Sequence, residues 1–265
     1  MSEGFLYIPE QLEEYKEGIL QSVKPTIKVK AEKGSTKLWE SKIGGNPYLP
    51  IGADAPKSAK GVPLKLLAQI NFEDVPPMEN MPKTGILQFY TDVTHYLIGM
   101  SLDNRTEQKD FRVIYHPEVI KDRNKLIVGF EEIQGETVID IPEAKLEFAK
   151  GVQPVTSGDY RFNSEYLKGF DEDKEVKDGD NLVELGEFYY TNMSESGHRM
   201  GGYPFFTQFD PRDEGSEYDT LLLQIDSDES IGLMWGDVGV ANFFINKDKL
   251  AKLDFSDVLY NWDCC

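Results

Sequence analysis

The sequence contains only two cysteines, which are adjacent, at Cys264 and Cys265. A disulfide framework needs partners that are separated along the chain, so we expect none, and we expect a reduced, cytoplasmic compartment. No run of about 18 apolar residues occurs, so no membrane-spanning helix is expected. The first residues lack the basic and apolar segments of a secretory signal, and we expect none.

Basic residues are also scarce, with 28 Lys and Arg against 47 Asp and Glu, for a net charge of −19. Each contact with a phosphate backbone needs a cation, so no nucleic-acid partner is expected. An anionic membrane surface is disfavoured for the same reason. The acidic excess has two interpretations, which are solubility and a surface that docks a basic protein. The partner that we expect is a basic protein.

Catalytic and cofactor motifs are missing too. The sequence has no G-x-S-x-G elbow, no G-x-G-x-x-G or G-x-x-x-x-G-K-[ST] loop and no H-E-x-x-H pair. No cofactor is therefore expected. Hydrophobic residues make up 40% of the 265 residues, which is enough for a substantial folded core.

What the sequence does contain is a block of three short motifs that occurs twice. The first copy is Gly44-Gly45-Asn46-Pro47-Tyr48, Leu66-Leu67-Ala68-Gln69-Ile70-Asn71 and Gly85-Ile86-Leu87-Gln88-Phe89-Tyr90. The second is Gly201-Gly202-Tyr203-Pro204-Phe205, Leu222-Leu223-Gln224-Ile225-Asp226 and Gly239-Val240-Ala241-Asn242-Phe243-Phe244. One order at nearly equal spacing indicates an internal duplication. The prediction is a single domain, residues 1–265, with two pseudo-symmetric halves at about 26–133 and 181–265.

The expected fold class is α+β, a mainly antiparallel sheet built from the duplicated β-rich unit, with helices packed on the sheet and at the N-terminus. Hydrophobic periodicity predicts strands at 26–30, 63–72, 85–91, 96–102, 111–116, 126–133, 220–226, 231–235, 240–246 and 255–260. It predicts helices at 9–22, 142–150, 159–170, 181–192 and 248–253, and residues 171–180 read as a solvated loop. The two strands with the Leu-Leu-x-Gln-Ile pattern are predicted to lie side by side at the centre.

Several segments resemble one known family. They are Ser41-Lys42-Ile43-Gly44-Gly45, residues 63–72 and 85–90, Gly197-His198-Arg199-Met200-Gly201-Gly202-Tyr203-Pro204, Met234-Trp235-Gly236-Asp237 and Leu259-Tyr260-Asn261-Trp262-Asp263. The combination is similar to the YwqG-like family of bacterial proteins, from about residue 41 to the end. The resemblance implies a cytosolic bacterial protein without an assigned activity, and an immunity-type or accessory binding role. It carries over no catalytic or binding residue.

A basic residue precedes each Gly-Gly pair, since Lys42 aligns with Arg199 and Ser41 with His198. Such a residue beside the backbone N–H groups of a Gly-Gly loop suits an anion or a peptide carboxylate. The candidate binding residues are Trp39, Lys42, Gly44, Gly45, His198, Arg199, Gly201 and Gly202, which this hypothesis places in one cleft. The alternative is structural: the cation pairs with a local carboxylate, and the glycines only turn the chain.

Polar side chains inside and after the second Gln-Ile strand give two further candidates. His198, Asp226, Asp228 and Asp237 suit a hard metal such as Mg²⁺ or Ca²⁺, although aspartates are also common in turns. Gln69 and Gln224 lie within apolar strands, where a buried amide must find partners. Each bonds the backbone of its Gly-Gly loop or meets the other near the axis, and ligand contact is the alternative.

Three functions remain open. The first is a non-enzymatic cytosolic binding or accessory protein, with an immunity-type role as one form of it. The second is a metal-assisted hydrolase centred on His198, Asp226, Asp228 and Asp237. The third is a small-molecule or peptide binder at the two GGxP loops.

Overall fold

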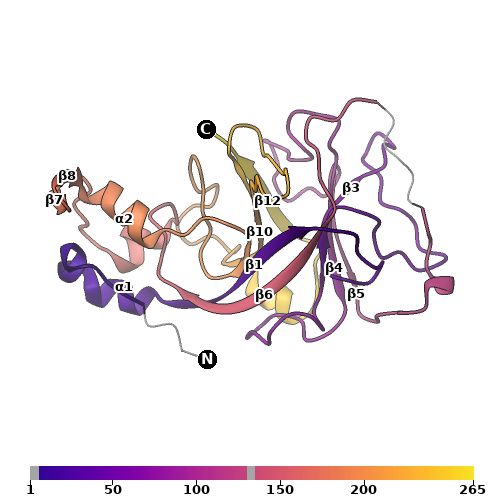
Figure 1. Ribbon diagram of the computed structural model, residues 1–265, viewed down its shortest axis with the longest axis horizontal. Coiled ribbons are helices and arrows are strands. Elements are labelled where there is room, and N and C mark those ends of the chain that lie inside the picture. Colours follow the sequence, from indigo (N-terminus) through magenta and orange to yellow (C-terminus); the bar gives the residue numbers. More distant parts are fainter. Residues whose placement is uncertain (1–5, 130–134) are drawn as a thin grey trace.

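A computed structural model describes residues 6–129 and 135–265. Its main feature is a ten-stranded sheet in the order β12-β11-β10-β9-β1-β6-β2-β3-β4-β5, and a separate hairpin pairs β7 with β8 (Figure 1). The strands are β1 (Lys24–Lys33), β2 (Lys42–Ile43), β3 (Lys65–Asn71), β4 (Ile86–Thr91), β5 (Phe111–His116), β6 (Ala144–Gln153), β7 (Glu175–Asp178), β8 (Asn181–Glu184), β9 (Arg199–Gly201), β10 (Thr220–Asp226), β11 (Val240–Ile245) and β12 (Val258–Asp263). All of these pairings are antiparallel.

The helices are short. They are η1 (Glu10–Tyr15), α1 (Lys16–Ser22), η2 (Arg123–Lys125), η3 (Phe162–Tyr166), α2 (Leu185–Met193) and α3 (Lys247–Ala251). Within residues 6–129 and 135–265, no helix is long and apolar enough to cross a membrane. The α+β, mainly antiparallel class expected from the sequence is confirmed.

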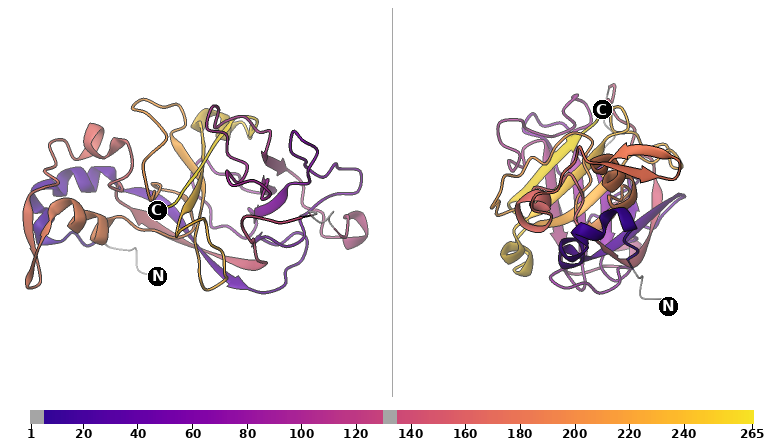
Figure 2. Two further views of the ribbon diagram at one scale, coloured as in Figure 1. Left: turned by 90° about the horizontal axis from the view of Figure 1, so that it is seen from above. Right: turned by 90° about the vertical axis from the view of Figure 1, so that its left-hand side faces the viewer.

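The helices η1, α1, η3 and α2 and the β7–β8 hairpin form a small lobe, which we call the helical lobe. It lies at one end of the molecule, where the long strands β1 and β6 lead out of the sheet (Figures 1 and 2). Its own core contains Leu12, Ile19, Leu185 and Tyr189, all fully buried. The main core is separate and contains buried side chains from both ends of the sheet.

A buried ion network joins the helical lobe to the sheet. Asp159 accepts two hydrogen bonds from the guanidinium of Arg161, both at 2.7 Å, and one from that of Arg212 at 2.9 Å. Arg212 also binds Asp210 at 2.7 Å, and its guanidinium lies 4.0 Å from the centroid of the Phe244 ring on β11. Burial alone would raise the pKa of Asp159, but the hydrogen bond from Arg161 and the charges of Arg212 and Arg161 hold it below its usual range. The carboxylate therefore stays ionised between two guanidinium groups.

The strand order is symmetric about the central β1–β6 pair, with four consecutive strands on each side of it. The series β12-β11-β10-β9 flanks β1, and the series β5-β4-β3-β2 flanks β6. The register shifts between Leu66 and Ala68 on β3, and between Leu221 and Leu223 on β10. The two outer series thus agree in direction of pairing and in the position of the irregularity.

Several predicted elements differ from the structure. The predicted helix at 142–150 is wrong, because Ala144 to Glu147 alternate inward and outward in β6, which pairs with β1 over ten residues. The predicted strands at 96–102 and 231–235 are wrong, since residues 96–99 form a turn and residues 231–235 contain only one isolated bridge, from Leu233 to Asp228. The predicted loop at 171–180 contains β7, and the predicted helix at 181–192 begins with β8.

Two further predictions need correction. Residues 126–129 of the predicted strand 126–133 form no strand apart from one bridge between Pro50 and Leu126, and residues 130–134 lie outside the described residues. β3 and β10, which carry the Leu-Leu-x-Gln-Ile pattern, are not side by side. Four strands, β9, β1, β6 and β2, lie between them, because the long β1–β6 pair occupies the centre.

Candidate functional site

Each buried glutamine binds the loop around one Gly-Gly pair, Gln69 around the first pair and Gln224 around the second. Gln69 Oε1 accepts from Tyr48 N at 2.7 Å, and its Nε2 donates to Leu38 O at 2.8 Å. Gln224 Oε1 accepts from Phe205 N at 2.7 Å, and its Nε2 donates to Gly197 O at 2.7 Å. Both side chains are fully buried. The prediction that each amide binds the backbone of its loop is confirmed.

The basic residues before the Gly-Gly pairs are buried and bound to carbonyl oxygens. Lys42 Nζ donates to Lys37 O at 2.6 Å and to Asn46 O at 3.0 Å. Arg199 Nη2 donates to the carbonyls of Glu195 and Ser196. Burial lowers the pKa of Lys42 to about 8 and that of Arg199 to about 10. Each cation thus binds backbone carbonyls of the chain next to its own strand.

The glycines of both loops have left-handed dihedrals, as expected. The φ angles of Gly44 and Gly45 are 57° and 68°, and those of Gly201 and Gly202 are 65° and 67°. A Cβ on Gly44 would lie 2.4 Å from the carbonyl oxygen of Pro142. Neither conformation nor space therefore permits a side chain there.

The two loops do not share one cleft. β2 and β9, which carry Lys42 and Arg199, lie on opposite sides of the central β1–β6 pair. Trp39 packs instead against a small cluster that contains Tyr48 and Leu126. The structure brings His198 and Arg199 to the wall of a cleft that Lys42 and Trp39 do not line.

Three of the four metal-site candidates lie together. His198 Nδ1 accepts from the backbone N–H of Asp226 at 2.9 Å, and Nε2 lies 3.4 Å from Asp228 Oδ2. The neutral ring therefore carries its proton on Nε2. Asp226 Oδ2 accepts from Gly197 N at 2.6 Å. Asp237 is exposed in a later turn. Across the described parts of the chain, no group of three or more His, Cys, Asp or Glu is arranged to hold a metal ion.

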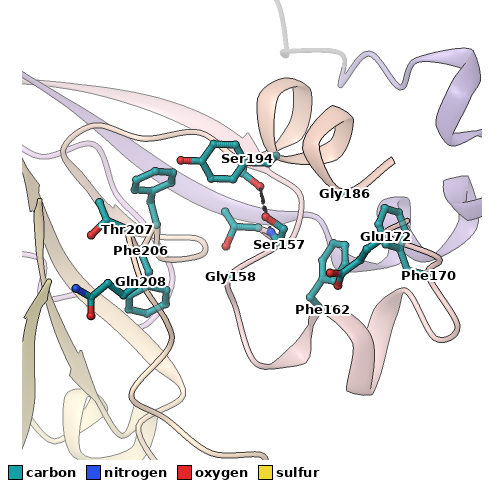
Figure 3. Close-up of a pocket in the computed structure, with 13 residues that line it drawn as sticks. Ser157, Gly158, Phe162, Phe170, Glu172, Gly186, Ser194, Phe206, Thr207 and Gln208 are labelled. Carbon is teal, nitrogen blue, oxygen red and sulfur yellow. Dashed lines mark hydrogen bonds between the residues drawn. The ribbon is translucent and has the colours of Figure 1, made fainter. Parts of the chain in front are cut away.

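An aromatic cleft of about 350 Å³ opens between the helical lobe and the sheet. Its aromatic lining residues are Phe162, Phe170, Tyr190, Phe205 and Phe206. Figure 3 shows Phe162, Phe170 and Glu172 at one end, Phe206, Thr207 and Gln208 at the other, and Ser157 and Ser194 between them. The hydroxyl groups of Ser157 and Ser194 are 3.3 Å apart. The cleft thus offers apolar walls with a few polar groups, the usual composition of a ligand site.

A second, more polar cleft of about 490 Å³ adjoins the aromatic cleft, since Ser194 lines both. His198, Arg199, Asn192 and Lys28 are among the residues that line it. Lys28 Nζ binds Glu195 at 2.8 Å. The two clefts together surround the C-terminal end of α2 and the start of β9.

Sequence reasoning missed most of the aromatic cleft. Phe205 belongs to the second repeat motif, but Phe162, Phe170 and Tyr190 lie between residues 159 and 193, outside both repeated motifs. The spacing of four between Phe162, Tyr166 and Phe170 predicted a helix. It did not indicate that two of these rings line a cleft.

Residues 41–264 match a protein family described as a domain of unknown function, DUF1963. A search of curated proteins gave no match.

Proposed function

The chain belongs to the DUF1963 family, a domain of unknown function, and from that premise we propose that it is a binding protein rather than an enzyme. Its ligand is a polypeptide segment of a basic partner, held in the aromatic cleft. The observation that carries the proposal is the wall of five aromatic side chains, with hydroxyl and amide groups spaced along it. Aromatic anchors in a desolvated pocket supply most of the binding energy in protein recognition.

The length of the site supports a polypeptide as the ligand. The aromatic cleft and the polar cleft are neighbours, because Ser194 lines both. An extended segment can therefore place an apolar side chain among the rings and polar backbone beside Ser157 and Asn192. The expected peptide site at the two GGxP loops is thus replaced by a site on either side of the second loop, with His198 and Arg199 before it and Phe205 and Phe206 after it.

Charge supports a basic partner. Glu172 is the only charged residue that lines the described aromatic cleft, and the whole chain carries a net charge of −19. A cationic segment is drawn toward such a surface and gains on-rate from it.

The contacts of His198 favour a binding protein over a hydrolase. Its Nδ1 is occupied by a backbone N–H, and its Nε2 faces Asp228. In the described part of the chain no serine or cysteine is bonded to this ring, so no nucleophile is activated by it. A metal would need a nitrogen of this ring as a ligand, and both nitrogens already face groups of the protein, so the metal-assisted hydrolase is the weaker alternative.

We also propose that the two halves arose by duplication. β9 places Arg199 opposite Lys28 on β1, and β2 places Lys42 opposite Lys145 on β6. In the β1–β6 pair, Lys28 lies opposite Ala149, and Glu32 lies opposite Lys145. A twofold axis through the Lys30–Glu147 pair relates all of these positions.

This relation supports a second copy that begins at β6 instead of residue 181, with η3, the β7–β8 hairpin and α2 inserted after it. The finer family resemblance is part of the same proposal: a YwqG-like bacterial protein of the cytoplasm, with an immunity-type or accessory role. The two free cysteines are consistent with a reducing compartment.

Selection from a phage-displayed library of random dodecapeptides tests the binding function. We expect enriched peptides to carry positive charge, and to bind the Tyr190→Ala and Phe205→Ala proteins at least about tenfold more weakly, or about 1.4 kcal/mol. Phe209→Ala is the matched control, because Phe209 is 65% exposed and does not line the cleft. The absence of enrichment, or equal binding to all four proteins, would contradict the proposal.

A further inference from the structure

One end of the aromatic cleft combines a carboxylate with two aromatic rings. Phe162 and Phe170 form an edge-to-face pair with centroids 5.0 Å apart and planes inclined by 76°. Glu172 lies beside them, and the three side chains gather at the end of the cleft that is farther from Gln208 (Figure 3). Rings attract cations through their faces and accept the methylene stems of long cationic side chains.

We propose that this end of the cleft binds an alkylammonium group, the side-chain ammonium of a lysine on the partner. The inference rests on the proposed function and names the chemical group that the site selects. The ammonium lies at the Glu172 carboxylate, and the methylene stem lies along Phe162 and Phe170.

The backbone and side chain of Glu172 are both held in place. Its carbonyl oxygen accepts from Gly186 N, at the start of α2, at 3.0 Å. Its Oε1 accepts from Asn163 Nδ2 at 3.3 Å. A cation that arrives therefore meets a carboxylate that is already positioned, which lowers the entropic cost of binding.

The same geometry favours an ammonium over a guanidinium. A guanidinium binds best when both oxygens of a carboxylate face its planar fork, whereas an ammonium is a compact point charge that needs one oxygen. Asn163 already engages Oε1 of Glu172. Lys174, two residues away, does not compete, because its Nζ binds Glu14 at 2.7 Å.

The test uses three small probes, the Nα-acetyl N-methylamides of lysine, norleucine and arginine. Their binding to the full chain is followed by the amide chemical shifts of Gly158 and Gly186, which line the cleft. We expect the lysine probe to bind about tenfold more tightly than the norleucine probe, which lacks the charge. We expect the arginine probe to be weaker than lysine, and added salt to reduce the difference between lysine and norleucine.

Two variants complete the test. Glu172→Gln keeps the shape and removes the charge, so we expect lysine and norleucine probes to bind it equally. Glu187→Gln is the matched control, because Glu187 is exposed on α2 and does not line the cleft, and the preference for lysine should persist. Equal binding of lysine and norleucine by the unaltered protein, an arginine probe as tight as lysine, or a preference unchanged in Glu172→Gln would each overturn the assignment.

Failure of this inference is distinguishable from failure of the binding function. If the selected dodecapeptides depend on Tyr190 but not on Glu172, the cleft binds a polypeptide and the ammonium assignment is wrong. If they depend on neither residue, the proposed function itself is wrong.

Discussion

Phe89 and Phe243 pack ring against ring, with centroids 4.8 Å apart and planes inclined by 54°. They lie on β4 and β11, the second strand from each edge of the ten-stranded sheet. Strands so far apart in the order meet only because the sheet curls until its inner faces touch. The two residues follow Gln88 and Asn242 at matching places in the repeated motifs, so the contact joins the two occurrences of that motif.

Removal of either ring should destabilise the protein strongly. We expect Phe89→Ala and Phe243→Ala each to lower the free energy of unfolding by about 3–5 kcal/mol, because both side chains are fully buried. In the double variant the two losses should not add, with a coupling of about 0.5–1.5 kcal/mol from the ring contact. Urea denaturation measures all three. Strictly additive losses would show that the two rings do not interact.

Both buried glutamines should contribute to stability. Gln69→Leu leaves Tyr48 N without its acceptor, and Gln224→Leu does the same to Phe205 N. We expect each change to cost about 1–3 kcal/mol, with the larger cost at Gln69, because its side chain also donates to Glu40 O and accepts from Gln88 Nε2. Urea denaturation of both variants measures the two costs. No loss of stability at either site would show that these hydrogen bonds are dispensable.

The fold was more accessible from the sequence than the site, and the reasons are physical. β3 and β10 were readable because every position from Leu66 to Asn71, and from Leu221 to Asp226, is buried, which produces an apolar run. The hydrogen bonds of Gln69 and Gln224 were also predictable, because a glutamine buried in an apolar strand must have hydrogen-bond partners.

β6 was misread because its residues between Pro142 and Lys150 fit a helical period as well as a strand. What decides the conformation is pairing with β1, more than 100 residues earlier in the chain, and no local pattern contains that information. The aromatic cleft was not predicted for the same reason, since contacts between distant segments leave no local pattern. Phe170, Tyr190 and Phe206 come from three separated segments that only the packing of the helical lobe brings together.

The buried ion network should be essential for stability. Asp159→Asn removes the negative charge that separates Arg161 from Arg212, and so leaves two guanidinium groups undercompensated. Loss of one partner from a buried ion pair costs about 3–5 kcal/mol, and we expect a loss of that size in the free energy of unfolding. The control is Glu13→Gln, whose partner Lys16 lies on the surface, and which should change stability by less than about 1 kcal/mol. Urea denaturation measures this loss. An unfolding midpoint for Asp159→Asn equal to that of the unaltered protein would show that the network is dispensable.

Stability should fall as the solution becomes mildly acidic. Burial lowers the pKa of His198 below 6.5, against the opposing charges of Asp228 and Asp226, and burial lowers that of His116 as well. Below pH 6.5 the unfolded chain binds protons at these histidines that the folded protein does not. The free energy of unfolding therefore decreases from about pH 6.5 downward until the folded histidines titrate, by at most about 1.4 kcal/mol per pH unit for each.

Urea denaturation at pH 7.5 and pH 5.5 measures this loss. The variant with both His116→Gln and His198→Asn retains polar atoms at the bonded positions and should lose less stability between the two pH values. His95→Gln is the control, because His95 is exposed, and it should follow the unaltered protein. An identical loss in the double variant would place the effect elsewhere.

Binding of a basic polypeptide segment in the aromatic cleft should protect the backbone of the cleft from hydrogen exchange. Hydrogen–deuterium exchange, with and without a saturating dodecapeptide selected on the protein, measures this protection. We expect slower exchange in residues 156–158, 186–194 and 205–208, and unchanged exchange around Gly44 and Gly45. Protection confined to the first Gly-Gly loop, or no protection in the cleft segments, would show that the peptide does not bind in the aromatic cleft.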